Sequence, residues 1–228
     1  MHTSSDLINY YNYLPSNLKP AKVKNIGYNK HHVDFPCRIL VSGKSNSGKT
    51  LAILNFLALA GPQFDKLTII TKKVEPLYEM MKQNNPDSCE IIELGNEGEV
   101  FPKIESFNGN LQNFVIFDDL VNSEYMKNCK EFFVRGRKTR PYALNMCFIT
   151  QDYFKTDSTL RKNMTDTWIF KPASMNEQRS IERDFPILKQ IPQIWTALNK
   201  KRSEDVNKFI NINSDTGAVR INFGPQVA

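Results

Sequence analysis

Short apolar segments alternate with amphipathic segments along the middle of the chain. The apolar runs are bounded by Gly, Pro or polar residues and have the length of buried parallel strands. Strands are predicted at Arg38–Ser42, Leu67–Thr71, Cys89–Leu94, Phe114–Phe117, Leu144–Ile149 and Thr167–Phe170, the last being the final strand of the main sheet. Helices are predicted between them at Leu51–Ala60, Pro76–Gln83 and Ser123–Val134. This alternation predicts an α/β fold, with a mainly parallel sheet covered by helices on both faces.

The two ends of the chain have a different pattern. Residues 1–36 show little periodicity and are predicted to form an extended N-terminal arm, whose aromatic residues Tyr10–Leu14 either dock on a neighbour or form a disordered lead-in. Beyond Pro172, two helices are predicted at Met175–Asp184 and Ile187–Leu198, the second delayed or kinked by Pro192, followed by a hairpin of Phe209–Ile212 and Val219–Phe223. The predicted division is therefore an arm (1–36), a core (37–172) and a C-terminal segment packed on that core (173–228).

A phosphate-binding motif joins the first predicted strand to the first predicted helix. It consists of Gly43, Lys44, Ser45, Asn46, Ser47, Gly48, Lys49 and Thr50. The two glycines allow a tight turn in which backbone N–H groups face phosphate oxygens, and the helix start adds its positive dipole end. Lys49 is predicted to reach the β- and γ-phosphates of ATP, and the Thr50 hydroxyl to bind Mg²⁺.

Two carboxylates complete this predicted nucleotide site. Asp118 and Asp119 follow the apolar strand Phe114–Phe117, and the carboxyl ends of such strands gather at the ligand-binding edge of the sheet. We expect Asp118 to hold Mg²⁺, usually through water, and Asp119 to act as the base that orients the attacking water. The alternative for Asp119 is that it caps the next helix.

Two further segments carry candidate chemistry. Gln151 follows the strand Leu144–Ile149 and is placed to contact the γ-phosphate or the lytic water, or else simply begins a loop. The basic segment Arg135–Arg140 has three interpretations: an arginine finger for a neighbouring subunit, phosphate contacts to nucleic acid, or a solvated loop.

Composition and charge exclude few classes of function. The 228 residues suit one main domain, and the net charge of +6 permits a polyanionic partner without requiring one. The four cysteines are scattered without metal-ligand spacing, which predicts buried, reduced thiols of a cytosolic-type compartment. The sequence shows no secretory signal pattern and no apolar run long enough to span a membrane, so no transmembrane segment is expected.

The ordered set of motifs resembles a known family. Gly43–Thr50, Phe117–Asp119, Phe133–Arg137 and Cys147–Phe154 together are similar to the poxvirus-type genome-packaging ATPases of large DNA viruses and virophages, within the FtsK–HerA superfamily. The most specific element is the strand ending in Thr150-Gln151 and followed by Tyr153-Phe154. The resemblance extends from about Pro36 to Pro172 and implies a RecA-like P-loop NTPase fold.

This resemblance also implies a function and residue roles. The implied activity is ATP hydrolysis by a pentameric or hexameric ring that moves double-stranded DNA into a preformed capsid, with capsid proteins as further partners. The implied place is the host cytoplasm or viral factory, with association to the virion during assembly. Gln151 matches the family's sensor glutamine, and Arg137 matches the arginine of a Gly-Arg-His stretch in which Lys138 here replaces the histidine. Arg137 is therefore the first choice for the finger, with Arg140 and Arg161 as alternatives.

Other functions remain open at this stage. One is another translocase or helicase of the same superfamily; another is a nucleotide-gated assembly factor that performs no transport. A GTPase is less favoured because the Asn-Lys-x-Asp guanine motif is missing from the sequence. Candidate DNA contacts are Lys72-Lys73, Lys155 and Lys200–Arg202, each of which is also compatible with ordinary surface charge.

Overall fold

A computed structural model of the chain describes residues 13–15, 19, 21, 23–95, 100–121, 124–139, 141–199 and 208–227. The strands in these ranges are β1 (Arg38–Ser42), β2 (Lys66–Thr71), β3 (Cys89–Glu93), β4 (Asn113–Asp118), β5 (Asn145–Thr150), β6 (Asp166–Ile169), β7 (Ile210–Asn213) and β8 (Val219–Ile221). The α-helices are α1 (Tyr28–His31), α2 (Lys49–Ala60), α3 (Pro76–Asn84), α4 (Met126–Arg135), α5 (Ser158–Lys162), α6 (Met175–Asp184) and α7 (Gln193–Asn199). Short 3₁₀ turns occur at Ile104–Ser106, Gly136–Lys138 and Pro186–Gln190.

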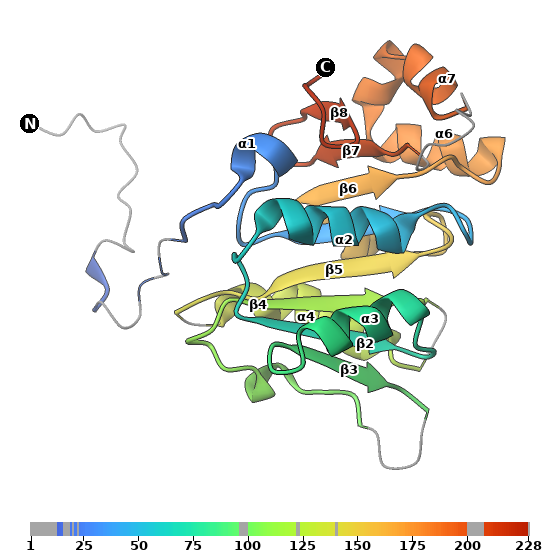
Figure 1. Cartoon of the computed structure of the whole chain (residues 1–228). Helices are drawn as coiled ribbons and strands as arrows, with labels where there is room; N and C mark the ends of the chain where they lie inside the picture. Colours follow the sequence, from blue (N-terminus) through green and yellow to red (C-terminus); the bar gives the residue numbers. More distant parts are fainter. Residues whose placement is uncertain are drawn as a thin grey trace, which may run out of the picture.

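The strands form one mixed sheet in the order β3-β2-β4-β5-β1-β6-β7-β8 (Figure 1). The six strands from β3 to β6 are parallel, while β7 and β8 are antiparallel additions. The predicted mainly parallel α/β fold is therefore confirmed. Thr71 pairs with Asp118, and Ser42 pairs with both Thr150 and Ile169, so the carboxyl ends of five strands meet at one edge.

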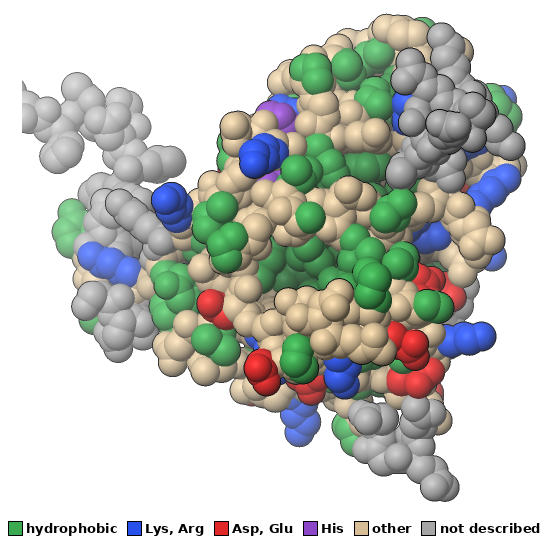
Figure 2. Space-filling model, in the orientation of Figure 1, with side chains coloured by type: hydrophobic (Ala, Val, Ile, Leu, Met, Phe, Trp, Pro, Cys, Tyr) green, Lys and Arg blue, Asp and Glu red, His purple; other side chains and the backbone are tan. Residues whose placement is uncertain are grey.

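Helices cover both faces of the sheet, as predicted. Alternate side chains of β1 enter different cores: Ile39 and Val41 pack with residues of α2, whereas Leu40 packs on the side that carries α4, α6 and α7. Helix α2 has no charged residue after Lys49, and Figure 2 shows hydrophobic side chains in the middle of the face that carries α2 and α3. Such an apolar surface favours contact with another molecule.

The ends of the chain differ from the sequence prediction in three ways. Thr167–Phe170 is not the final strand of the sheet, because the predicted hairpin extends it through the antiparallel pairing of β7 with β6. The helix predicted at Ile187–Leu198 is divided at Pro192 into a 3₁₀ turn and α7, since proline cannot donate the backbone hydrogen bond that would continue it. The last part of the predicted arm contains α1, and His31 and Val33 are fully buried there.

One buried carboxyl links the strands of this added edge. Asp166 of β6 is fully buried and accepts hydrogen bonds from Thr165 Oγ1 at 2.9 Å and from Asn213 Nδ2 at 3.3 Å. Burial raises the pKa of Asp166 to about 7, and the two hydrogen bonds only partly offset this rise.

Candidate nucleotide site

The phosphate loop connects β1 to the N-terminus of α2. Gly48 precedes the helix with a φ of 91°, and Asn46 also has a left-handed φ of 59°, so the backbone turns sharply as the motif requires. Gly43 N donates to the carbonyl of Thr150 at 3.2 Å, which ties the start of the loop to β5. The loop thus lies at the carboxyl edge of the sheet, as the sequence predicted.

Gly43 is required for a different reason from Gly48. A Cβ atom at Gly43 would lie 2.5 Å from the Cβ of Phe170 and 2.8 Å from Ser47 Oγ. Close packing, rather than an unusual φ, therefore excludes a side chain at this position. The same contact fixes the residue after β6 against the phosphate loop.

The Lys49 side chain folds back over the loop. Its Nζ donates to the carbonyl oxygens of Gly43 and Lys44, both at 2.8 Å. Burial lowers the pKa of Lys49, while the nearby carboxylates Asp118, Asp119 and Glu75 act in the opposite direction. To bind a triphosphate, the ammonium exchanges the carbonyl oxygens for phosphate oxygens.

Asp118 ends β4 and is held by a tyrosine. Its side chain is buried, and its Oδ2 accepts a hydrogen bond of 2.8 Å from the hydroxyl of Tyr78, a fully buried residue of α3. Burial raises the pKa of Asp118 to about 6; Glu75 and Asp119 add to the rise, while Tyr78 and Lys49 oppose it. Tyr78 therefore fixes one oxygen of the carboxylate and leaves the other for a cation.

Sequence reasoning missed Tyr78 and a third carboxylate, Glu75. Glu75 precedes α3, and its Oε2 accepts a 3.0 Å hydrogen bond from Thr50 Oγ1. A hydroxyl that donates its proton to Glu75 keeps its lone pairs free for a metal ion. The available signal was the position of Glu75 a few residues beyond the carboxyl end of β2, next to the Pro that opens a helix.

The side chains of Asp119 and Gln151 are in contact. Asp119 has a φ of 54°, and its Oδ2 accepts a hydrogen bond of 3.2 Å from Gln151 Nε2. The next helix, α4, begins only at Met126 with Tyr125 as its cap, so Asp119 is not a helix cap. A left-handed φ is uncommon outside glycine and is often found at functional sites.

The donor set fits Mg²⁺. Thr50 supplies a hydroxyl and Asp118 a carboxylate, both hard oxygen ligands, and Mg²⁺ typically takes its remaining ligands from phosphates and water. Among the described residues, no cluster of three or more His, Cys, Asp or Glu side chains forms a metal site by itself.

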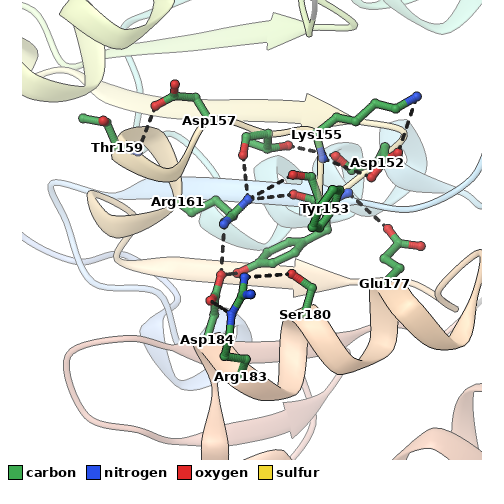
Figure 3. A network of polar contacts seen from close by, with 12 residues as sticks. Asp152, Tyr153, Lys155, Asp157, Thr159, Arg161, Glu177, Ser180, Arg183 and Asp184 are labelled. Atoms are coloured by element: carbon green, nitrogen blue, oxygen red, sulfur yellow. Dashed lines mark hydrogen bonds and ion pairs between the residues drawn. The ribbon is translucent and has the colours of Figure 1, made fainter.

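Arg161 holds the loop after Gln151 (Figure 3). Arg161 Nη1 donates to the carbonyls of Tyr153, Phe154 and Thr156, its Nε forms a 3.0 Å ion pair with Asp184, and its guanidinium lies 5.1 Å from the ring centre of Tyr153. Only 13 % of its side chain is exposed. Arg161 is engaged within its own subunit, so we discard it as a candidate finger.

Arg137 lies at the opposite edge of the sheet from the phosphate loop. It is exposed, belongs to the turn after α4, and lines a cavity with Pro36, Gln112 and Asn145, which lie at the amino ends of the parallel strands. It is also close enough to Arg38, the first residue of β1, to lower the pKa of that guanidinium, although burial lowers it more. Arg137 cannot serve the phosphate loop of its own chain from there.

Only some of the candidate DNA contacts lie within the described residues. Lys72 and Lys73 are exposed just beyond β2, at the carboxyl edge. Lys155 is exposed and forms an ion pair of 3.7 Å with Asp152. Arg140 and Lys200–Arg202 lie outside the described residues.

All four cysteines are buried and unpaired, as predicted.

Solved structures share this architecture at low sequence identity. The DNA-packaging ATPase B204 of Sulfolobus turreted icosahedral virus superposes with a TM-score of 0.57 and 12% identity, over 82% of this chain and 96% of that one. The genome-packaging NTPase B204 of Sulfolobus turreted icosahedral virus 2, in complex with ATP-gammaS, gives a TM-score of 0.55, 12% identity and the same coverage. The chain has a P-loop NTPase fold. ATPases 2 and 3 of EssC from Geobacillus thermodenitrificans match 92% of this chain with a TM-score of 0.52 and 10% identity, but only 47% of their own length.

The P-loop NTPase fold that the resemblance implied is therefore confirmed. No protein-family model and no curated protein matches the sequence. The poxvirus-type branch therefore stays a prediction.

None of the described helices combines the length and hydrophobicity needed to cross a bilayer.

Proposed function

We propose that this chain is an ATPase that acts as a ring-shaped motor and moves double-stranded viral DNA into a preformed capsid. The observation that carries the proposal is the convergence of Lys49, Thr50, Asp118, Asp119 and Gln151 at one sheet edge, on a fold that resembles packaging NTPases.

The proposed hydrolysis step uses these side chains directly. Lys49 and the loop amides bind the β- and γ-phosphates, and Thr50 and Asp118 would hold Mg²⁺, which would supply charge neutralisation. Gln151 and Asp119 position the attacking water, and Asp119 accepts its proton. The new bond joins the water oxygen to the γ-phosphorus while the bond to the bridging oxygen of ADP breaks, giving ADP and phosphate.

Ring assembly is supported by the separation of Arg137 from the phosphate loop. Because the two lie at opposite edges of one subunit, a finger role for Arg137 would require a neighbour in a head-to-tail arrangement. The hydrophobic surface over α2 and α3 supports contact with another subunit (Figure 2). In this proposal the motor works in the host cytoplasm or viral factory and contacts capsid proteins.

The test is steady-state ATP hydrolysis as a function of protein concentration, with and without double-stranded DNA. Turnover should rise with both and be abolished by Lys49→Ala. Arg137→Ala and Asp119→Asn should each lower turnover strongly, since an arginine finger contributes roughly 10³–10⁵-fold. An equal mixture of these two variants should recover activity at about one interface in four, where intact Asp119 and intact Arg137 meet across a heterologous contact.

Two outcomes separate the alternatives. Slow turnover that is independent of concentration and DNA would contradict the motor and favour a nucleotide-gated assembly factor. Separation of the strands of a forked duplex would favour a helicase, whereas displacement of a triplex-forming strand without unwinding is expected of a translocase.

A further inference from the structure

The loop that carries Gln151 is held by a helix from a different part of the chain. This loop, residues 151–156, follows β5, whereas the helix, α6, follows β6 on the other side of β1. We propose that Glu177, in the first turn of α6, is a positioning residue for Gln151: it holds the loop where the Gln151 amide meets Asp119 and the attacking water. This inference rests on the proposed hydrolysis step and adds a residue that acts through Gln151.

The place of the Gln151 amide depends on the backbone around it. Gln151 is exposed, and its amide reaches Asp119 Oδ2 at 3.2 Å. An exposed side chain keeps much of its rotational freedom, so its reach is set by the segments before and after it. Thr150 is buried before it, and its carbonyl accepts from Gly43 N at 3.2 Å. The remaining constraint comes from the part of the loop that follows Gln151.

Glu177 joins the segments that follow β5 and β6. Its Oε1 accepts from Tyr153 N at 3.1 Å (Figure 3), and its Oε2 accepts from Ala173 N at 2.5 Å. Both N–H groups belong to backbone outside helices and strands, where a side-chain acceptor takes the place of secondary structure. The phosphate loop leaves the sheet between these segments, because β1 lies between β5 and β6. One buried carboxylate therefore sets the spacing of the two segments that flank the phosphate loop.

The other end of α6 holds the same tyrosine. Asp184 ends α6 about two helical turns after Glu177, so the two carboxylates lie on one face of the helix. Asp184 Oδ2 accepts from the Tyr153 hydroxyl at 3.0 Å, and Tyr153 is buried. Tyr153 is thus attached to α6 at both its backbone N–H and its hydroxyl (Figure 3). The contact with Glu177 involves the backbone itself, so it bears most directly on where Gln151 lies.

The geometry requires a carboxylate at position 177. Each of its oxygens accepts one N–H, whereas a glutamine amide has one oxygen and an NH₂ group that would face the second N–H. The first turn of α6 also favours a negative charge, because unpaired amide groups and the positive end of the helix dipole lie there. Glu177→Gln should therefore release Tyr153 or Ala173 with little change in side-chain volume.

The experiment is a double-mutant cycle between Glu177→Gln and Gln151→Ala. It is read by steady-state ATP hydrolysis with double-stranded DNA, at a protein concentration beyond which turnover no longer rises. Glu177→Gln should lower kcat about 10–100-fold, the order of loss expected when a positioned group moves by about 1 Å. The KM for ATP should stay within about twofold of wild type, because the phosphate loop keeps its contact with Thr150.

The double variant gives the decisive comparison. Gln151→Ala alone should lower kcat at least as much as Glu177→Gln. The double variant should then be no slower than Gln151→Ala, because Glu177 acts through a side chain that this variant lacks.

Two control variants on the same helix separate positioning from stability. Glu182→Gln makes the same substitution at a residue that accepts from Gln178 within α6, and it should leave kcat unchanged. Ser174→Ala removes the hydroxyl that accepts from Glu177 N at 3.2 Å and caps α6. This change should lower Tm by about 2–4 °C without lowering kcat.

The outcomes distinguish this inference from the proposed function. Wild-type kcat in Glu177→Gln, or a double variant much slower than Gln151→Ala, would overturn the positioning role, while wild-type turnover that is abolished in Lys49→Ala leaves the ATPase site intact. If Glu177→Gln unfolds at the assay temperature, Glu177→Asp replaces it in the cycle. The shorter carboxylate keeps the charge but cannot span both donors, so the same loss and the same non-additivity are expected. Wild-type protein that does not hydrolyse ATP would overturn both proposals.

Discussion

The hydrogen bond between Tyr78 and Asp118 gives a sharp test of how the candidate metal site is held. Tyr78→Phe removes the hydroxyl and keeps the ring. The bond is 2.8 Å long, both residues are buried, and the acceptor is a carboxylate. Loss of a hydrogen bond to a charged group costs about 1.5–3 kcal/mol. At pH 8 Asp118 is ionised, since its pKa is about 6, so the whole effect should be visible.

For a protein of this size, about 2 kcal/mol corresponds to a fall in Tm of roughly 4–8 °C. Urea and thermal unfolding at pH 8 measure both quantities. The matched control is Tyr28→Phe, because Tyr28 is 42% exposed and its substitution should leave the free energy of unfolding within about 0.5 kcal/mol of wild type.

The same variant should loosen the metal site. A carboxylate without its partner is free to rotate, and loss of such a supporting hydrogen bond typically lowers metal affinity about 10–100-fold. The Mg²⁺ concentration needed for half-maximal binding of a fluorescent ATP analogue should rise accordingly. Wild-type stability together with an unchanged Mg²⁺ requirement would refute the positioning role of Tyr78.

Three other variants test separate features. Glu75→Gln should raise the Mg²⁺ requirement for nucleotide binding several-fold, because it removes one negative charge beside Thr50, and an unchanged requirement would exclude Glu75 from the site. Gly43→Ala should lower the free energy of unfolding by about 1–3 kcal/mol through overpacking against Phe170 and abolish nucleotide binding; a wild-type Tm would contradict this. Burial raises the pKa of Asp166 to about 7, so the folded protein keeps this carboxyl protonated at pH values where the unfolded chain, above about pH 4, has lost the proton. The free energy of unfolding should therefore fall by roughly 2–4 kcal/mol between pH 5 and 8. Asp166→Asn should flatten this dependence in urea titrations, and an equally steep profile in the variant would show that another group is responsible.

Most of the fold was predictable because parallel strands are buried on both faces and so appear as continuous apolar runs. The predicted strand Arg38–Ser42 and helix Met175–Asp184 coincide with the observed elements. The hairpin of β7 and β8 was predicted, but its pairing with β6 depends on long-range contacts that periodicity does not encode. Helix α1, with only four residues, is too short to give a periodic signal.

The site was predictable where a motif fixes spacing along the chain. Lys49 and Thr50 open the helix after β1, Asp118 ends β4 and Gln151 follows β5. The shared carboxyl edge of these strands brings them together. Glu75 and Tyr78 were missed because their roles depend on β2 lying next to β4, and strand order is not readable from one sequence. Arg161 was kept as an alternative finger because the sequence does not reveal its ion pair with Asp184, which only the folded structure shows.

The position of Arg137 has a consequence for counting active sites. In the proposed assembly, with Arg137 as the finger, an open row of subunits contains one fewer complete site than it has members, whereas a closed ring has as many sites as subunits. Closing the ring therefore adds the final complete site, because the unpaired phosphate loop at one end of the row then meets the unpaired finger at the other end. Specific activity per subunit would then report ring closure itself, without any need to see the ring.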